Sequence, residues 1–105
     1  MTGLSFSEFY DKLYYGADIE LTLNKWHYMI YCGWEKDTND RIHSIKIVKS
    51  DQPFYERTAS PNIWDEIFES KMNNANKNIE DFLNAKIFET KSFYEVESNI
   101  VINYS

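Results

Sequence analysis

Polar and apolar residues alternate strictly over residues 18–23, which is typical of a strand with one buried face. Residues 24–25, Asn-Lys, fit a two-residue turn, because asparagine tolerates the left-handed backbone that such turns need. A second β-rich segment covers residues 26–34 and a third covers residues 41–49, with a polar loop over 35–40 between them. The pattern therefore predicts three antiparallel strands connected as a meander.

The two predicted turns fix a register for these strands. The first turn pairs Leu21 with Tyr28 and Ile19 with Ile30, and the second pairs Ile30 with Ile45. A shift by one residue would move the apolar residues of a whole strand to the other face, so agreement between the two hairpins supports the meander. The residues predicted to share one face are Ile19, Leu21, Leu23, Trp26, Tyr28, Ile30, Ile45 and Ile47.

The spacing Ser-x-x-Glu occurs at residues 5–8 and again at residues 92–95. In a capping box of this kind the hydroxyl and the carboxylate each bind a backbone N–H at the start of a helix. The first occurrence predicts a helix over residues 5–14, which Gly16 ends, and the second predicts a short helix that begins near residue 92.

Two further helices are predicted between the meander and that last helix. Ser60 and Pro61 suit the N-cap and the first position of a helix. Apolar residues follow at helical spacing, namely Ile63, Trp64, Ile67, Phe68 and Met72. Residues 73–78 are rich in asparagine and predict an exposed loop or a frayed helix end, and residues 79–83 predict one or two helical turns opened by Asn78.

Together these elements predict an α+β fold. Alternation of Ile100, Ile102 and Tyr104 adds a fourth strand. We expect a three- to four-stranded antiparallel meander with short helices packed on one face, the face that carries Ile19 and its neighbours. The length of 105 residues leaves room for one domain, residues 1–105.

Composition limits the function classes. Acidic residues outnumber basic ones by 17 to 11, which argues against nucleic acid as a partner because counterion release needs clustered lysine and arginine. No run of 18 apolar residues is present, so no membrane-spanning segment is expected. The single cysteine cannot form an intramolecular disulfide, and the first residues do not resemble a secretory signal, so we expect a cytoplasmic protein.

The other face of the predicted meander carries an apolar group within a polar rim. Met29 and Tyr31 lie there beside Ile42 and Val48, with charged residues around them. Such an arrangement is typical of a protein-binding surface. The alternative is that the C-terminal helices cover this side and complete a three-layer core.

The preferred hypothesis is an acidic binding protein that occludes a partner protein, in the manner of an immunity or inhibitor protein. The acidic surface would speed the encounter with a basic partner such as a nuclease toxin. Met29, Tyr31 and Trp34 are the predicted anchors, and Glu35 and Asp37 are the predicted steering charges. A homodimeric structural subunit that uses the same sheet face is an alternative.

A small enzyme is the other alternative. The predicted register sets Cys32 opposite His43, and a thiol beside an imidazole can act as a nucleophile. The competing interpretation is that Cys32 packs as a small apolar residue. His27 falls on the opposite face from His43, and no zinc-type spacing or phosphate-binding glycine loop is present, so no metal and no cofactor are expected.

Two segments carry a resemblance to a known group of proteins. They are residues 9–33, FYDKLYYGADIELTLNKWHYMIYCG, and residues 81–96, DFLNAKIFETKSFYEV. These segments resemble small uncharacterised single-domain proteins of Gram-positive bacteria with A/T-rich genomes, often associated with mobile elements. In that group a glycine precedes the late Lys-Ser pair, and in this chain Thr90 stands at that position. The resemblance implies a small accessory domain and assigns no catalytic residue.

Overall fold

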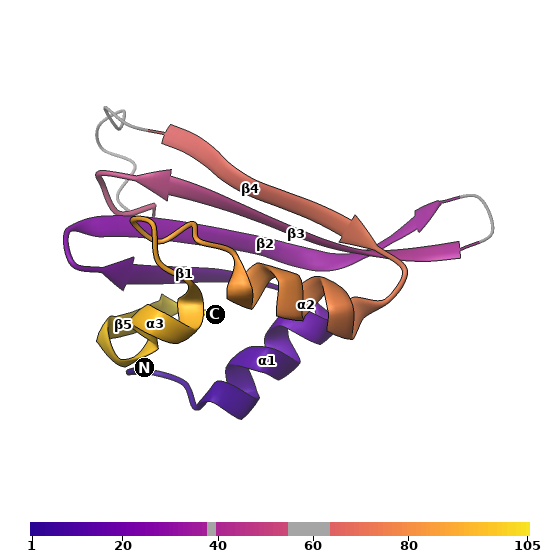
Figure 1. The fold of residues 1–105 in the computed structure, drawn as a ribbon, viewed down its shortest axis with the longest axis horizontal. Helices are drawn as coiled ribbons and strands as arrows, with labels where there is room; N and C mark the ends of the chain where they lie inside the picture. The colour runs from indigo at the N-terminus through magenta and orange to yellow at the C-terminus, as the bar shows by residue number, and fades with distance from the viewer. Residues whose placement is uncertain (38–39, 55–63) are drawn as a thin grey trace.

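The chain folds into an antiparallel sheet with helices on one side (Figure 1). A computed structural model describes residues 1–37, 40–54 and 64–105. Within these ranges the strand order is β4-β3-β2-β1-β5. The strands are β1 (Ala17–Leu23), β2 (Trp26–Asp37), β3 (Asp40–Ser50), β4 (Trp64–Met72) and β5 (Ile100–Tyr104). The helices are α1 (Phe6–Tyr15), α2 (Ala75–Asn84), α3 (Phe93–Val96) and the 3₁₀ turn η1 (Glu97–Asn99). The α+β class is therefore confirmed.

The first hairpin has the predicted register. Leu21 pairs with Tyr28 and Ile19 pairs with Ile30 across β1 and β2. Asn24 occupies the turn with a φ of +57°, the left-handed conformation that a tight turn requires. Local alternation and turn chemistry were sufficient to fix this pairing.

The second hairpin is shifted by two residues from the predicted register. Ile30 pairs with Ile47, so Cys32 lies opposite Ile45 and not opposite His43. The reason is that the two strands extend unequally. β2 continues three residues beyond its predicted end, to Asp37, whereas β3 begins only one residue early, at Asp40, so the centre of the turn moves by one residue. A shift of two residues keeps each side chain on its predicted face, because side chains alternate with a period of two. The faces were therefore predicted correctly and the cross-strand neighbours were not.

Helix α1 begins and ends as predicted. Ser5 accepts a hydrogen bond from the backbone N–H of Glu8, whose carboxylate accepts one from the Ser5 N–H in return. The helix ends at Gly16, which has a φ of +110° and donates its N–H to the carbonyl of Lys12. A Cβ at Gly16 would lie 3.2 Å from the Cα of Gly33 and 3.3 Å from the carbonyl oxygen of Cys32.

Replacing Gly16 with alanine is expected to lower the free energy of unfolding by about 2–3 kcal/mol, because the new Cβ combines backbone strain with a clash against β2. Chemical denaturation measures this loss. Gly33→Ala is the matched control, since its Cβ would meet no heavy atom nearer than 3.9 Å. Equal losses in the two variants would show that neither strain nor the clash at Gly16 limits stability.

The helix predicted from residue 61, with apolar positions up to residue 72, is instead strand β4 over residues 64–72, and the prediction was wrong there. Ile47 pairs with Phe68 and Val48 pairs with Glu66, so Ile67 is an extra residue in a β-bulge. The bulge places two apolar residues in succession, and this break in alternation imitates helical spacing. The predicted cap at residues 60–61 and the first apolar position of that helix, residue 63, lie outside the described residues.

Helix α2 begins earlier than predicted. Asn74 caps it by accepting a hydrogen bond from the N–H of Lys77, and Asn78 lies inside the helix, fully buried. The prediction of an exposed loop or a frayed helix end over residues 73–78 was therefore wrong for residues 75–78, which belong to the helix, and Asn74, Asn76 and Asn78 all have side-chain hydrogen bonds. The Ser92 capping box and the terminal strand β5 are present as predicted.

The core lies between the sheet and the helices. Phe9 stacks on Phe93 at 4.8 Å, and Tyr28 of the sheet contacts Phe88 edge-on at 5.1 Å. The fully buried sheet residues include every predicted inward-facing isoleucine, namely Ile19, Ile30, Ile45 and Ile47. All three α-helices cover this face (Figure 1), so the alternative of a three-layer core was wrong.

The β2–β3 hairpin extends beyond the other strands. β1 stops where Ala17 pairs with Cys32, and β4 stops where Met72 pairs with His43. The remainder of the hairpin projects as a two-stranded arm, which we define as residues 35–37 and 40–42 (Figure 1). Among the helices of the described residues, none has the length and apolar character needed to cross a membrane.

Candidate functional site

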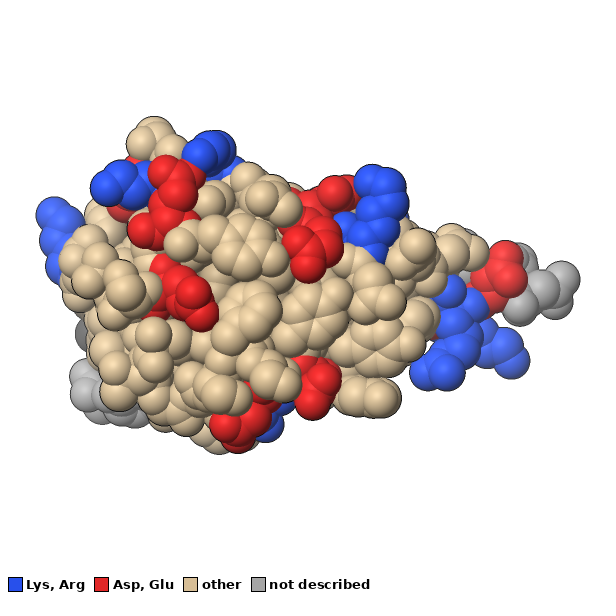
Figure 2. Space-filling model, turned by 60° about the horizontal axis from the view of Figure 1, so that its bottom comes forward, with Lys and Arg blue, Asp and Glu red and all other residues tan. Residues whose placement is uncertain are grey.

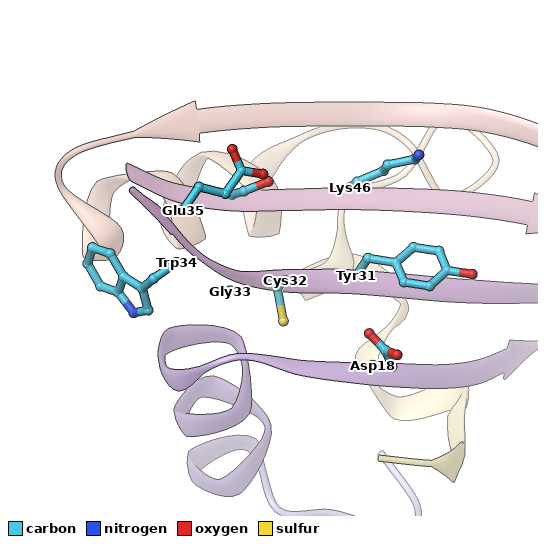
Figure 3. Close-up of a pocket in the computed structure, with 8 residues that line it drawn as sticks. Asp18, Tyr31, Cys32, Gly33, Trp34, Glu35 and Lys46 are labelled. Atoms are coloured by element: carbon cyan, nitrogen blue, oxygen red, sulfur yellow. The ribbon is translucent and has the colours of Figure 1, made fainter. Parts of the chain in front are cut away.

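The outer face of the sheet, opposite the helices, has a hollow of about 280 Å³ (Figure 3). Its floor is at Gly33, which has no side chain to fill the space. The lining residues are Asp18, Tyr31, Cys32, Gly33, Trp34, Glu35, Ser44 and Lys46. Three of them, Tyr31, Trp34 and Glu35, are residues that the sequence predicts as binding residues.

The charges at the rim of this hollow are mixed. The carboxylate of Glu35 lies 3.1 Å from the ammonium of Lys71, and Lys46 lies opposite Glu69 in the strand pairing. Asp18 and Tyr31 are cross-strand neighbours, and their side chains are on the same side of the sheet (Figure 3). A rim of this kind presents both positive and negative charge and does not favour a cationic ligand over an anionic one.

The apolar patch predicted on the outer face is less exposed than its sequence suggests. Met29 is half-buried and pairs with Val48, which is only 3% exposed. Tyr31 is the most exposed of the predicted anchors on this face, at 36%. The backbone of Asp37 pairs with Asp40, and the side chain of Asp37 lies outside the described residues.

Trp34 belongs to the opposite side of the sheet from Tyr31. Its indole Nε1 donates a 2.8 Å hydrogen bond to the carbonyl of Tyr14 at the end of α1, and its ring meets His43 edge-on at 5.2 Å. The guanidinium of Arg41 lies over the same ring, 4.9 Å from its centre. The structure therefore separates the predicted anchors Tyr31 and Trp34 onto two different surfaces.

Cys32 is held by backbone groups. Its Sγ lies 3.2 Å from the carbonyl oxygen of Ala17 and 3.6 Å from that of Lys12, both acceptors for the thiol hydrogen. Burial raises the pKa of the Cys32 thiol to about 11, with a smaller contribution from the Asp18 carboxylate. A nucleophilic cysteine needs the opposite shift. This environment matches the interpretation of Cys32 as a packing residue.

His43 is part of a buried polar network between α1, α2, β3 and β4. Its Nε2 donates to the carbonyl of Leu13 at 2.6 Å, and its Nδ1 accepts from the Asn78 amide at 2.9 Å. The same amide nitrogen approaches the carbonyls of His43 and Ser70, and the Ser70 hydroxyl donates to the Asn78 oxygen. Burial lowers the pKa of His43, which favours the neutral imidazole that these hydrogen bonds require.

The helix layer presents a surface that the sequence analysis missed. Phe6, Tyr10 and Tyr14 recur every four residues along one side of α1, and each is half-buried. Tyr94 of α3 extends the row at one end, with its ring 6.0 Å from Phe6, and Trp34 extends it at the other, 5.7 Å from Tyr14. We call these five residues the aromatic seam. Figure 2 shows uncharged side chains running across this layer toward the arm, with carboxylates beside them.

Carboxylates border the aromatic seam. The Tyr94 hydroxyl donates to Glu80 at 3.0 Å. Burial raises the pKa of Tyr10 and of Tyr94, and the nearby Glu80 carboxylate raises both further. Glu97 adds to the shift at Tyr94. The seam therefore combines amphipathic rings with negative potential.

Within the described residues no group of three or more histidine, cysteine, aspartate or glutamate side chains is placed to hold a metal ion. No family model, curated protein or solved structure matches this chain. The resemblance to small proteins of Gram-positive bacteria therefore stays a prediction.

Proposed function

We propose that this protein binds another protein through the aromatic seam and acts by occluding its partner, in the manner of an immunity or inhibitor protein. A cytoplasmic location and a basic partner, both expected from the sequence, are part of this proposal. The observation that carries it is the row of partly exposed rings, which joins three separate elements, α1, α3 and the root of the arm.

Aromatic side chains of this kind suit a protein interface. Tyrosine and tryptophan offer a large contact area at a small cost in side-chain entropy, and they are enriched among residues that dominate binding energy. Tyr94 is 44% exposed, and Tyr15, whose ring lies 4.9 Å from that of Tyr14, is 75% exposed. The hollow on the outer face has charges of both signs and gives no comparable reason to expect a protein partner there.

The double variant Tyr10→Ala/Tyr94→Ala is expected to weaken partner binding at least tenfold, because it removes the ring in the middle of the seam and the ring at its α3 end. The tagged wild-type protein would be used to retain a partner from an extract of the source cells. That partner would then be identified by mass spectrometry and purified, and its dissociation constant measured for each variant.

Two single variants serve as controls. Tyr104→Ala removes a tyrosine that is 62% exposed on β5, and Tyr31→Ala removes the predicted anchor of the outer face. Both are expected to leave the dissociation constant within about twofold of wild type. Loss of binding in Tyr31→Ala alone would assign the interface to the outer face and overturn the proposal. A stable homodimer in sedimentation that retains no partner would also overturn it, in favour of a structural subunit.

A further inference from the structure

We propose that the aromatic seam receives arginine side chains of the partner, and that the space beside Tyr10, Tyr94 and Glu80 is where one guanidinium binds. This inference rests on the proposed function, and it specifies the chemistry of the partner.

The geometry brings two phenol rings and a carboxylate together from three helices. The Tyr94 hydroxyl donates to Oε2 of Glu80 at 3.0 Å, which fixes the carboxylate beside the ring of Tyr94. The Tyr10 hydroxyl donates to Asn76 at 3.0 Å, and α1 is thereby connected to α2 near the same carboxylate. The ring of Phe6 lies 6.3 Å from Tyr10 and 6.0 Å from Tyr94. The rings are thus held in place before any partner arrives.

The electrostatics of this corner favour a cation. The other carboxylates of α2 and α3 have lysine partners, since Asp81 lies 3.2 Å from Lys77 and Glu95 binds Lys86. Among the described residues, no lysine or arginine forms an ion pair with Glu80. Its negative charge therefore remains available to a partner, whereas the hollow on the outer face already pairs Glu35 with Lys71.

Arginine fits this corner better than lysine. A planar guanidinium can stack on a tyrosine ring and donate two parallel hydrogen bonds to one carboxylate, whereas an ammonium ion offers a point charge without a plane. Cation–π attraction adds to the ion pair when the cation lies over the ring face. The same protein already shows this contact internally, where Arg41 lies over Trp34 at the far end of the seam.

The test uses small probes and needs no identified partner. N-acetyl-arginine methylamide would be titrated into ¹⁵N-labelled protein, with the neutral isostere N-acetyl-citrulline methylamide and the lysine derivative in parallel. We expect the largest amide shifts at Tyr10, Glu80 and Tyr94. We also expect the arginine probe to bind at least fivefold more tightly than citrulline and at least twofold more tightly than lysine.

Glu80→Gln is expected to weaken arginine binding at least threefold while it retains the acceptor for the Tyr94 hydroxyl. The control Glu69→Gln removes an exposed carboxylate from β4, on the outer face, and is expected to leave the affinity unchanged. Equal affinities for arginine and citrulline, or equal losses in the two variants, would overturn this inference. A different result would overturn the proposed function, namely undiminished binding of the partner by the Tyr10→Ala/Tyr94→Ala variant.

Discussion

Replacing Asn78 with alanine is expected to lower the free energy of unfolding by about 3–4 kcal/mol. The substitution removes the donor to Nδ1 of His43 and the acceptor of the Ser70 hydroxyl, and it leaves both polar groups without these partners. Each buried polar group that loses its partner costs about 1–3 kcal/mol, and a small cavity adds to this loss. Urea denaturation monitored by circular dichroism measures the change.

Two further variants show whether the loss comes from the network. Ser70→Ala removes one hydrogen bond to Asn78 and is expected to cost about 1 kcal/mol, an amount that keeps the protein folded. Asn84→Ala removes an exposed asparagine from the same helix, whose amide donates to the Glu80 carbonyl, and is expected to change stability by less than about 0.5 kcal/mol. A similar loss for Asn78 and Asn84 would show that the network contributes little.

The thiol of Cys32 is expected to react with iodoacetamide at pH 8 about 100-fold more slowly in the folded protein than in urea. Only the thiolate reacts, and a pKa raised from 9.0 to about 11 reduces its population at that pH by roughly this factor. The direction of this pKa shift also determines how the two alkylation rates depend on pH. Below pH 9 both rates rise tenfold per pH unit, and between pH 9 and 11 only the rate of the folded protein continues to rise. Mass spectrometry of quenched samples gives both rates.

Equal rates in the two states would contradict a buried, neutral thiol, and only a faster reaction in the folded protein would support an enzyme based on Cys32 and His43. The variant His43→Asn provides the matched test of that hypothesis. If the imidazole were the base for the thiol, its removal would slow alkylation. We expect no slowing, because the acceptors of the thiol are the Ala17 and Lys12 carbonyls.

The sequence was sufficient for features that depend on neighbouring residues. The capping boxes, the end of α1 and the β1–β2 register are decided by contacts within a few positions of the chain. The position of β3 depends on where its connection to β2 turns, and the composition of residues 35–40 did not reveal that β2 continues further into this segment than β3 does. The predicted register was therefore wrong by two residues, and His43 was wrongly placed opposite Cys32.

Features set by contacts between distant segments were not visible in the pattern. Ile67 is a bulge residue only because β4 pairs with β3, and Asn78 is buried only because α2 packs against the sheet, where its amide meets His43 of β3. The sequence shows only part of the aromatic seam. Phe6, Tyr10 and Tyr14 are spaced by four residues, which is also typical of an ordinary helix face. Its continuation to Tyr94 and Trp34 required the fold.

The place of β5 in the sheet has a kinetic consequence. β1 and β2 are joined by a two-residue turn, whereas β1 also pairs with β5, the last strand of the chain, where Thr22 lies opposite Val101. Closing so long a loop costs entropy that the local hairpin avoids, so contacts of high sequence separation slow folding. We therefore expect the meander to assemble first and β5 to join it last, with one side of β1 unpaired until that final step.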